Sequence, residues 1–201
     1  MIDFERILFN IDIPATIDAA AGTLLVAEPF LKEECFAHSV IYIVDHASDS
    51  SSMGVVLNHI TRHRLSDLID GIDSAHDTPV FCGGPVGTNR LFFMHTLGDI
   101  IPQSQEIGSG MYIGGDFDCM RQYINAGYPT EGKIRFFIGY SGWSARQLED
   151  EIQSNVWAVS GFKSAERLLK GHGDSYWHRT VRSMDSRFRG WLYHPQNPHA
   201  N

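Results

Sequence analysis

Apolar residues along this chain fall mostly into short runs, which is the pattern of buried β-strands. Residues 23–27 and 39–44 are rich in β-branched side chains and are bounded by glycine, proline or polar clusters. Residues 53–58 follow a polar segment at 45–52, so a hairpin with the preceding run is the simplest connection. The pattern therefore predicts strands in all three runs. Further short strands are predicted at residues 80–81, 91–96, 111–113, 134–140 and 157–159.

Helical periodicity appears between these runs. Apolar positions in residues 117–126 recur at spacings of three and four, with Asp116 as a suitable N-cap and a glycine just after the segment. Ser144 and Gln147 form the Ser-x-x-Gln pattern of a capping box, which predicts a helix through residue 154. Because helices are inserted irregularly among strand pairs, the predicted fold class is α+β. Shorter helices are predicted at residues 65–70, 163–170 and 175–184.

Length and composition narrow the class of protein. A chain of 201 residues, 43% hydrophobic and 20% charged, fits a single globular domain. Its longest apolar runs fall far short of the ~20 residues that cross a bilayer, so no membrane segment is predicted. The first residues lack the basic start and apolar stretch of a signal peptide, so we expect a cytoplasmic protein. Cys35, Cys82 and Cys119 are odd in number and far apart, which predicts three free thiols.

Charge is distributed unevenly along the chain, whose formal net charge is −8. Residues 172–201 hold four arginines and two aspartates, so this segment carries +2 and the preceding body −10. The segment is also rich in tyrosine, tryptophan and phenylalanine, which disfavours disorder. We therefore expect residues 1–171 to form a single α+β domain with 172–201 docked on it as a basic, aromatic extension. Direct nucleic-acid binding is not expected of so acidic a chain.

One candidate for chemistry is Gly139-Tyr140-Ser141-Gly142-Trp143, which follows a predicted strand and precedes a predicted helix. This is the context of the nucleophile elbow Gly-x-Ser-x-Gly, but the fifth position here is Trp143. A structural interpretation is favoured, in which the two glycines turn the backbone and Trp143 fills core space.

A second candidate is the glycine-rich turn Gly83-Gly84-Pro85, whose backbone N–H groups could cradle an anion. No Gly-Lys-Ser/Thr follows it, so it is not a P-loop. Cys82 precedes this turn, and His95 lies on the next predicted strand, so the two could form a thiolate–imidazole pair. An inert, partly buried thiol is the favoured alternative.

Metal and cofactor sites are not predicted. His59 and His63 have the spacing that would place two imidazoles on one face of a helix. Their segment is predicted as a loop before the helix at 65–70, so the rings need not converge. The glycine motifs also lack the spacing of a dinucleotide fingerprint.

Several motifs occur in a fixed order over about residues 20–190. They are GTLLVAEP at 22–29, FAHSVIY at 36–42, MGVVLN at 53–58, GGPV at 83–86, GYSGW at 139–143, QLE at 147–149 and NVW at 155–157. Together these motifs resemble the AlgH/YqgE family of bacterial proteins. The resemblance implies a mixed, bifurcated sheet curled into a pseudo-barrel with flanking helices. It implies little about mechanism: one namesake is linked to regulation of alginate synthesis as a transcriptional regulator, yet no DNA-binding motif is found here.

Two positions depart from the family pattern, which often has Arg at the position of His38 and Ala at that of Ser141. The leading hypothesis is a non-enzymatic binding or regulatory protein for a small ligand or a protein partner. The alternative is a hydrolase-like or thiol enzyme that uses Ser141 or Cys82 with a histidine such as His38 or His95. The predicted binding residues are His38, Gly83, Gly84, Pro85, Ser141, Gly142 and Trp143.

Overall fold

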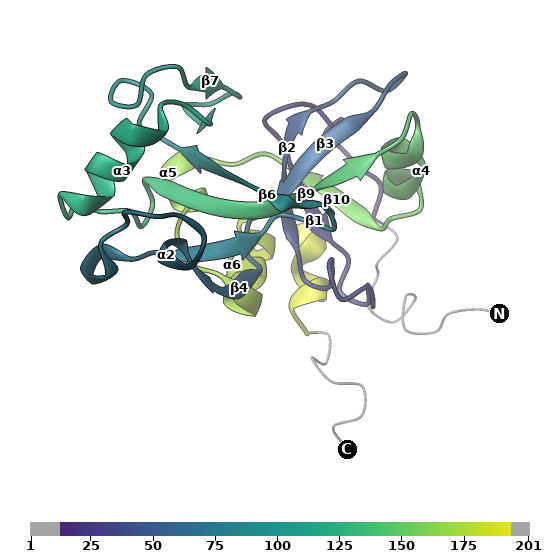
Figure 1. Ribbon diagram of the computed structural model, residues 1–201. Helices are drawn as coiled ribbons and strands as arrows, with labels where there is room; N and C mark the ends of the chain where they lie inside the picture. The colour runs from purple at the N-terminus through teal and green to yellow at the C-terminus, as the bar shows by residue number, and fades with distance from the viewer. Residues whose placement is uncertain (1–12, 194–201) are drawn as a thin grey trace.

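A computed structural model describes residues 13–193 of the protein (Figure 1). Within these residues ten strands form a single bifurcated sheet that curls into a half-barrel and is flanked by helices. The predicted fold class, a mixed α+β fold with a curled, bifurcated sheet, is confirmed. None of the described helices has the length and apolar character needed to span a membrane.

The first branch of the sheet is antiparallel, in the order β10-β1-β2-β3-β9. The predicted hairpin between residues 39–44 and 53–58 is β2–β3. The strands of this branch are β1 (Leu24–Ala27), β2 (Val40–Asp45), β3 (Ser52–Val56), β9 (Ile134–Trp143) and β10 (Trp157–Ser160).

The second branch also contains β9, which pairs with β6 on one side and in parallel with β5 on the other. The segment with His59 and His63 was predicted as a loop, and this is wrong: it includes β4, which pairs with β5 through Ile60 and Arg64. The strands of this branch are β4 (Ile60–Arg64), β5 (Pro79–Cys82), β6 (Val86–His95), β7 (Gln105–Glu106) and β8 (Tyr112–Ile113).

The fork lies within β9. Its first part pairs with β5 and β6, whereas its last three residues pair with β3. Gly139 lies at the change of partner, with a φ of +70° that L-amino acids rarely adopt. A β-carbon there would also collide with the carbonyl oxygen of Gly84. Glycine at this position therefore allows one strand to serve both branches.

In the described part of the chain, five α-helices and two 3-10 helices connect and cover the strands. The helix predicted from residue 117 is α3, and the Asp116 side chain caps it by accepting a hydrogen bond from the Cys119 N–H at 2.7 Å. Half of the predicted capping box is formed, since the Ser144 N–H donates to Gln147 Oε1. The helix itself, however, begins only at Gln147. The helices are α2 (Leu65–Leu68), η1 (Ser74–His76), α3 (Phe117–Asn125), α4 (Gln147–Gln153), α5 (Ala165–Leu168), α6 (Gly173–Ser183) and η2 (Ser186–Tyr193).

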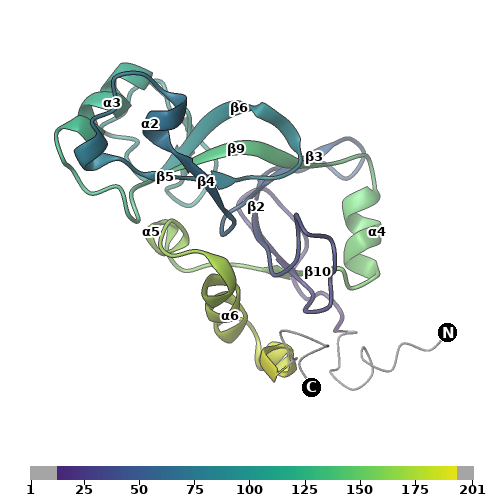
Figure 2. The ribbon, with the colours of Figure 1, turned by 60° about the horizontal axis from the view of Figure 1, so that its bottom comes forward.

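Both faces of the first branch are buried. Leu24 and Val26 of β1 point into a central apolar cluster with α5, α6 and η2, whereas Leu25 and Ala27 point into a second cluster beside α4. Figure 2 shows α5 and α6 together on one side of the sheet and α4 at another. Because alternate residues of a strand face opposite sides, a strand buried on both faces has a continuous apolar run. A third cluster lies between the second branch and α3.

The aromatic residues near the C-terminus are part of the central cluster. Tyr176, Trp177, Phe188 and Trp191 are buried, and the indole N–H of Trp177 donates to the carbonyl of Ala27 at 3.0 Å. The rings of Trp177 and Trp191 are stacked with centroids 6.4 Å apart. The division of the chain at residue 172 stays a prediction, and its residues 194–201 lie outside the described part.

Candidate functional site

The two predicted glycine-rich segments meet in the structure. The N–H of Gly83 donates to the carbonyl of Ile138 at 2.9 Å, and the Ser141 hydroxyl donates to the carbonyl of Gly83 at 3.2 Å. A β-carbon at Gly83 or Gly84 would collide with the backbone of Gly139 or Tyr140. The glycines are thus explained by close approach of two backbones. Ser141 is 0% exposed, so its hydroxyl does not face solvent.

The remaining predicted binding residues differ in exposure. Pro85 and Gly142 are exposed, whereas Trp143 is buried and its indole N–H donates to Glu151 Oε2 at 2.8 Å. His38 packs against α6, with its ring stacked on Trp177 at a centroid distance of 4.7 Å. Ligand binding by these residues stays a prediction. Those of them that are buried have clear structural roles.

Cys82 and His95 do not form the proposed thiolate–imidazole pair. Cys82 is aligned with Ile138 and His95 with Ile134, on opposite sides of β9 and about 13 Å apart along it at the usual strand rise. His95 Nε2 lies 2.9 Å from the Gly114 carbonyl, and its Nδ1 accepts from the Leu97 N–H at 3.1 Å. Nε2 must therefore carry the proton, and burial lowers the pKa of this imidazole.

Sequence reasoning missed a different Ser–His contact. Ser52 Oγ lies 2.8 Å from His46 Nδ1, and His46 Nε2 lies 3.5 Å from Glu149 Oε1. This is the order of groups in a serine hydrolase triad. The two hollows described below are not lined by Ser52, which is only 5% exposed. The hairpin prediction could have found the contact, because His46 and Ser52 lie at the ends of its turn.

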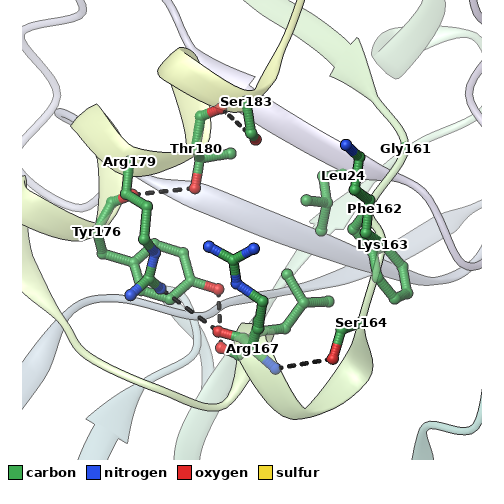
Figure 3. A pocket seen from close by; sticks show the side chains of 11 residues that line it. Leu24, Gly161, Phe162, Lys163, Ser164, Arg167, Tyr176, Arg179, Thr180 and Ser183 are labelled. Carbon is green, nitrogen blue, oxygen red and sulfur yellow. Dashed lines mark hydrogen bonds between the residues drawn. The ribbon is translucent and has the colours of Figure 1, made fainter.

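A pocket of about 280 Å³ lies between β1, α5 and α6 (Figure 3). Its apolar wall is made by Leu24, Phe162, Leu168 and the ring of Tyr176. Burial raises the pKa of Tyr176 to about 12, so this side chain is a neutral phenol at physiological pH. A second hollow of about 370 Å³ beside α4 is lined mainly by polar and acidic side chains. The first pocket has the mixture of apolar wall and few polar groups that is typical of ligand sites.

Cations surround the apolar wall of the first pocket. Arg179 Nη2 donates to the Lys170 carbonyl at 2.6 Å, and the guanidinium lies 4.5 Å from the Tyr176 ring centroid. The guanidinium of Arg167 stands in the middle of the pocket (Figure 3). Within residues 13–193 this side chain has no ion pair or hydrogen bond. Lys163 also lines the pocket, and no acidic residue among the described ones does so.

Only part of this pocket is signalled by the sequence. Lys163 and Arg167 are four residues apart in a segment predicted as helix 163–170, which would place both on one face. The structure has only the short α5 there, and Phe162 and Lys163 precede it. No three His, Cys, Asp or Glu side chains in the described part of the chain are grouped as metal ligands would be.

Comparison with known proteins assigns the family. Residues 24–189 match the model of a family described as AlgH-like. The chain belongs to this AlgH-like family. A UPF0301 protein of Parabacteroides distasonis is 39% identical over 181 residues, which cover 90% of each chain. A UPF0301 protein of Bacteroides fragilis is 39% identical over 180 residues, again covering 90% of each chain. The resemblance predicted from the sequence motifs is confirmed.

Two solved structures share the fold of this chain. The solution structure of the AlgH protein from Pseudomonas aeruginosa matches with a TM-score of 0.65 and 24% identity, covering 86% of this chain and 94% of that one. A crystal structure of a protein from Corynebacterium diphtheriae matches with a TM-score of 0.67 and 21% identity, covering 93% and 97%. Both matches agree with the curled, bifurcated sheet described above for this AlgH-like chain.

Proposed function

We propose that this AlgH-like protein is a non-enzymatic binding protein that holds a small ligand in the pocket between β1, α5 and α6. The observation that carries the proposal is the pocket itself, in which an apolar wall faces several convergent polar groups. Such a combination is the usual form of a small-molecule site. Leu24 and Tyr176 belong to the packed core, so the wall is rigid and largely preformed.

The proposal places the protein in the cytoplasm. Cys35, Cys82 and Cys119 are free thiols, which supports a reducing compartment. A regulatory role would then act through occupancy of the pocket. Direct nucleic-acid binding is not part of the proposal, because Arg179 is bound to a backbone carbonyl and Arg187 pairs with Asp185 at 3.1 Å.

The competing function is hydrolysis by Ser52 with His46 and Glu149. The 2.8 Å contact between Ser52 and His46 favours it. Burial of Ser52 argues against it, because a nucleophile must reach the carbonyl carbon of a substrate. We therefore assign this contact a structural role, in which the hydroxyl and imidazole tie the two ends of the β2–β3 turn.

A substitution that fills the pocket tests the proposal. Gly161 lines the pocket, its backbone is not left-handed, and a β-carbon there would meet nothing within 4 Å. Gly161→Phe is therefore expected to fold and to narrow the pocket. Gly142→Phe adds the same side chain at an exposed position on the surface predicted from the sequence, where a β-carbon makes only an ordinary contact.

The measurement is a screen of small acids, amides and alcohols by amide NMR shifts of the full-length protein. We expect bound fragments to shift amides around Leu24, Phe162 and Thr180, and Gly161→Phe to abolish these shifts. Gly142→Phe is expected to leave them unchanged. Shifts that lie around Gly84 and disappear in Gly142→Phe would overturn the proposal in favour of the other surface. An absence of fragment shifts in the pocket would also overturn it.

A further inference from the structure

We infer that the ligand of this pocket is a small organic carboxylate with an apolar body, bound through Arg167. The inference rests on the proposed function, since it assigns a ligand class to the same pocket. It follows from the distribution of charge, the use of the hydroxyl groups and the size of the cavity.

The charge of the pocket is opposite to that of the chain. The described lining includes Lys163, Arg167 and Arg179 and no carboxylate, although the net charge of the chain is −8. The adjacent acid, Glu166, interacts with Lys170 at 3.3 Å and with Lys133 at 3.6 Å. It therefore has cationic partners other than Arg167. A local positive site on an acidic protein favours an anionic ligand.

The two arginines of the pocket have different roles. Arg179 is held by the carbonyl of Lys170 and by the ring of Tyr176, so it supplies charge from a fixed position. Arg167 is exposed, and the donors of its guanidinium have no described partner. A guanidinium fork can bind a carboxylate through two parallel hydrogen bonds. Arg167 is thus the group available to hold the anionic end of a ligand.

The hydroxyl groups of the pocket offer a ligand few free hydrogen-bond donors. The Tyr176 hydroxyl donates to the Leu168 carbonyl at 2.8 Å, the Thr180 hydroxyl to the Tyr176 carbonyl at 3.0 Å, and the Ser183 hydroxyl to the Thr180 carbonyl at 2.7 Å. Three of the four lining hydroxyls therefore have their protons engaged with backbone. A neutral sugar would find few free donors beyond the cations, whereas an anionic group such as a carboxylate needs only the cations.

The cavity also limits the size of the ligand. Its volume of about 280 Å³ lies just below the roughly 300–1,000 Å³ of pockets that hold drug-sized molecules. The apolar wall of Leu24, Phe162 and Leu168 leaves room for a short aliphatic chain or one aromatic ring. Burial of that apolar body would supply affinity, and the charged end would fix its orientation.

Four probes separate the ligand class from the existence of a site. Octanoate has both an apolar body and a charge, octanamide keeps the body without the charge, and acetate keeps the charge without the body. Octyl phosphate distinguishes a carboxylate from another anion. The variants are Arg167→Gln and, as a matched control, Arg182→Gln, which changes an exposed arginine of α6 that does not line the pocket.

Titrations by amide NMR on the full chain give the outcomes. We expect octanoate to bind at least about tenfold more tightly than octanamide, acetate or octyl phosphate. Arg167→Gln should remove the preference over octanamide, which is the effect of one charged hydrogen bond. Arg182→Gln should leave this preference unchanged.

If octanamide binds in the pocket as tightly as octanoate, or Arg167→Gln has no effect, the ligand class is wrong and the proposed function stands. Tighter binding of octyl phosphate would also refute a carboxylate. If no probe shifts amides of the pocket at millimolar concentration, the proposed function fails as well.

Discussion

Trp143 and Trp157 meet edge to face, with their ring centroids 6.3 Å apart. Their indole N–H groups donate to the same carboxylate oxygen, Glu151 Oε2, at 2.8 and 2.7 Å. Both side chains are 4% exposed. One carboxylate of α4 thereby satisfies two buried donors and joins the end of β9 to the start of β10. Both tryptophans belong to the apolar cluster beside α4 on the first branch of the sheet.

Replacing Glu151 with alanine should destabilise the protein. Two buried indole donors would lose their acceptor, and each unsatisfied donor costs about 1–3 kcal/mol. We expect a loss of about 2–4 kcal/mol in the free energy of unfolding, measured by urea denaturation. Asp150→Ala, on the same helix at an exposed position, should change it by less than about 0.5 kcal/mol. Equal stabilities of the two variants would refute the role of Glu151.

Replacing Trp177 with alanine tests the docking of the C-terminal segment. This side chain is fully buried between β1, His38 and Trp191, and its truncation should cost about 3–5 kcal/mol. We expect a lower melting temperature and increased binding of a hydrophobic dye. Tyr193→Ala, at a residue that is 79% exposed, should change neither quantity. An unchanged melting curve for Trp177→Ala would mean that α6 contributes little to the fold.

The sequence correctly predicted those elements whose ends are determined by side chains nearby in the chain. The first residue of α3 was predicted correctly because the Asp116 side chain caps its N-terminus. β4 was missed because its residues lack an apolar alternation, and Ile60 is 46% exposed. Its extended conformation comes from pairing with β5, which is a tertiary effect. The fork in the sheet was predicted from the family resemblance and not from the periodicity of apolar residues.

The candidate site was predicted less completely for a similar reason. Gly83 and Ser141 do meet, but the residue types there are explained by backbone packing. The pocket joins Leu24 to Arg167 and Thr180, which are far apart in the sequence and are brought together only by the central apolar cluster. No local pattern encodes such a neighbourhood. Counting charges singled out the basic segment 172–201, which contains Arg179, but it did not single out Arg167, whose side chain has no described partner.

Removal of the Ser52 hydroxyl tests the hydrolase alternative. We expect the wild-type protein to hydrolyse p-nitrophenyl acetate no faster than Ser52→Ala, because the hydroxyl is buried beneath the β2–β3 turn. The variant should lose about 1 kcal/mol of stability, the usual net value of one hydrogen bond. Turnover that is present in the wild type and absent from Ser52→Ala would establish a catalytic role for Ser52 and overturn the binding proposal.

Stability should fall as the pH is lowered from 7 to 5. Burial lowers the pKa of His59 and of His95, so each takes up a proton less readily in the folded protein than in the unfolded chain, where histidines are protonated below about pH 6.5. For His59, the Ala37 carbonyl and Asp174 oppose this effect without cancelling it. The difference in unfolding free energy between pH 7 and pH 5 should therefore be smaller in His59→Gln and in His95→Gln. The prediction is wrong if the difference in unfolding free energy between pH 7 and pH 5 is the same in the wild type and in both variants, because the three proteins share all other titratable groups.

Gly84→Ala should destabilise the protein although Gly84 lies in a turn predicted to bind a ligand. The residue has a φ of +148°, and a β-carbon would collide with the Tyr140 backbone, which no side-chain rotation can relieve. The two strands would have to separate where the sheet forks, at a cost of about 1–3 kcal/mol. Gly161→Ala is the control, because its β-carbon would enter open space. Urea denaturation should show a clear loss for Gly84→Ala and no loss for Gly161→Ala. If Gly84→Ala instead retained full stability, the close backbone contact would not explain the glycine, and a direct role of this turn in binding would become the better account.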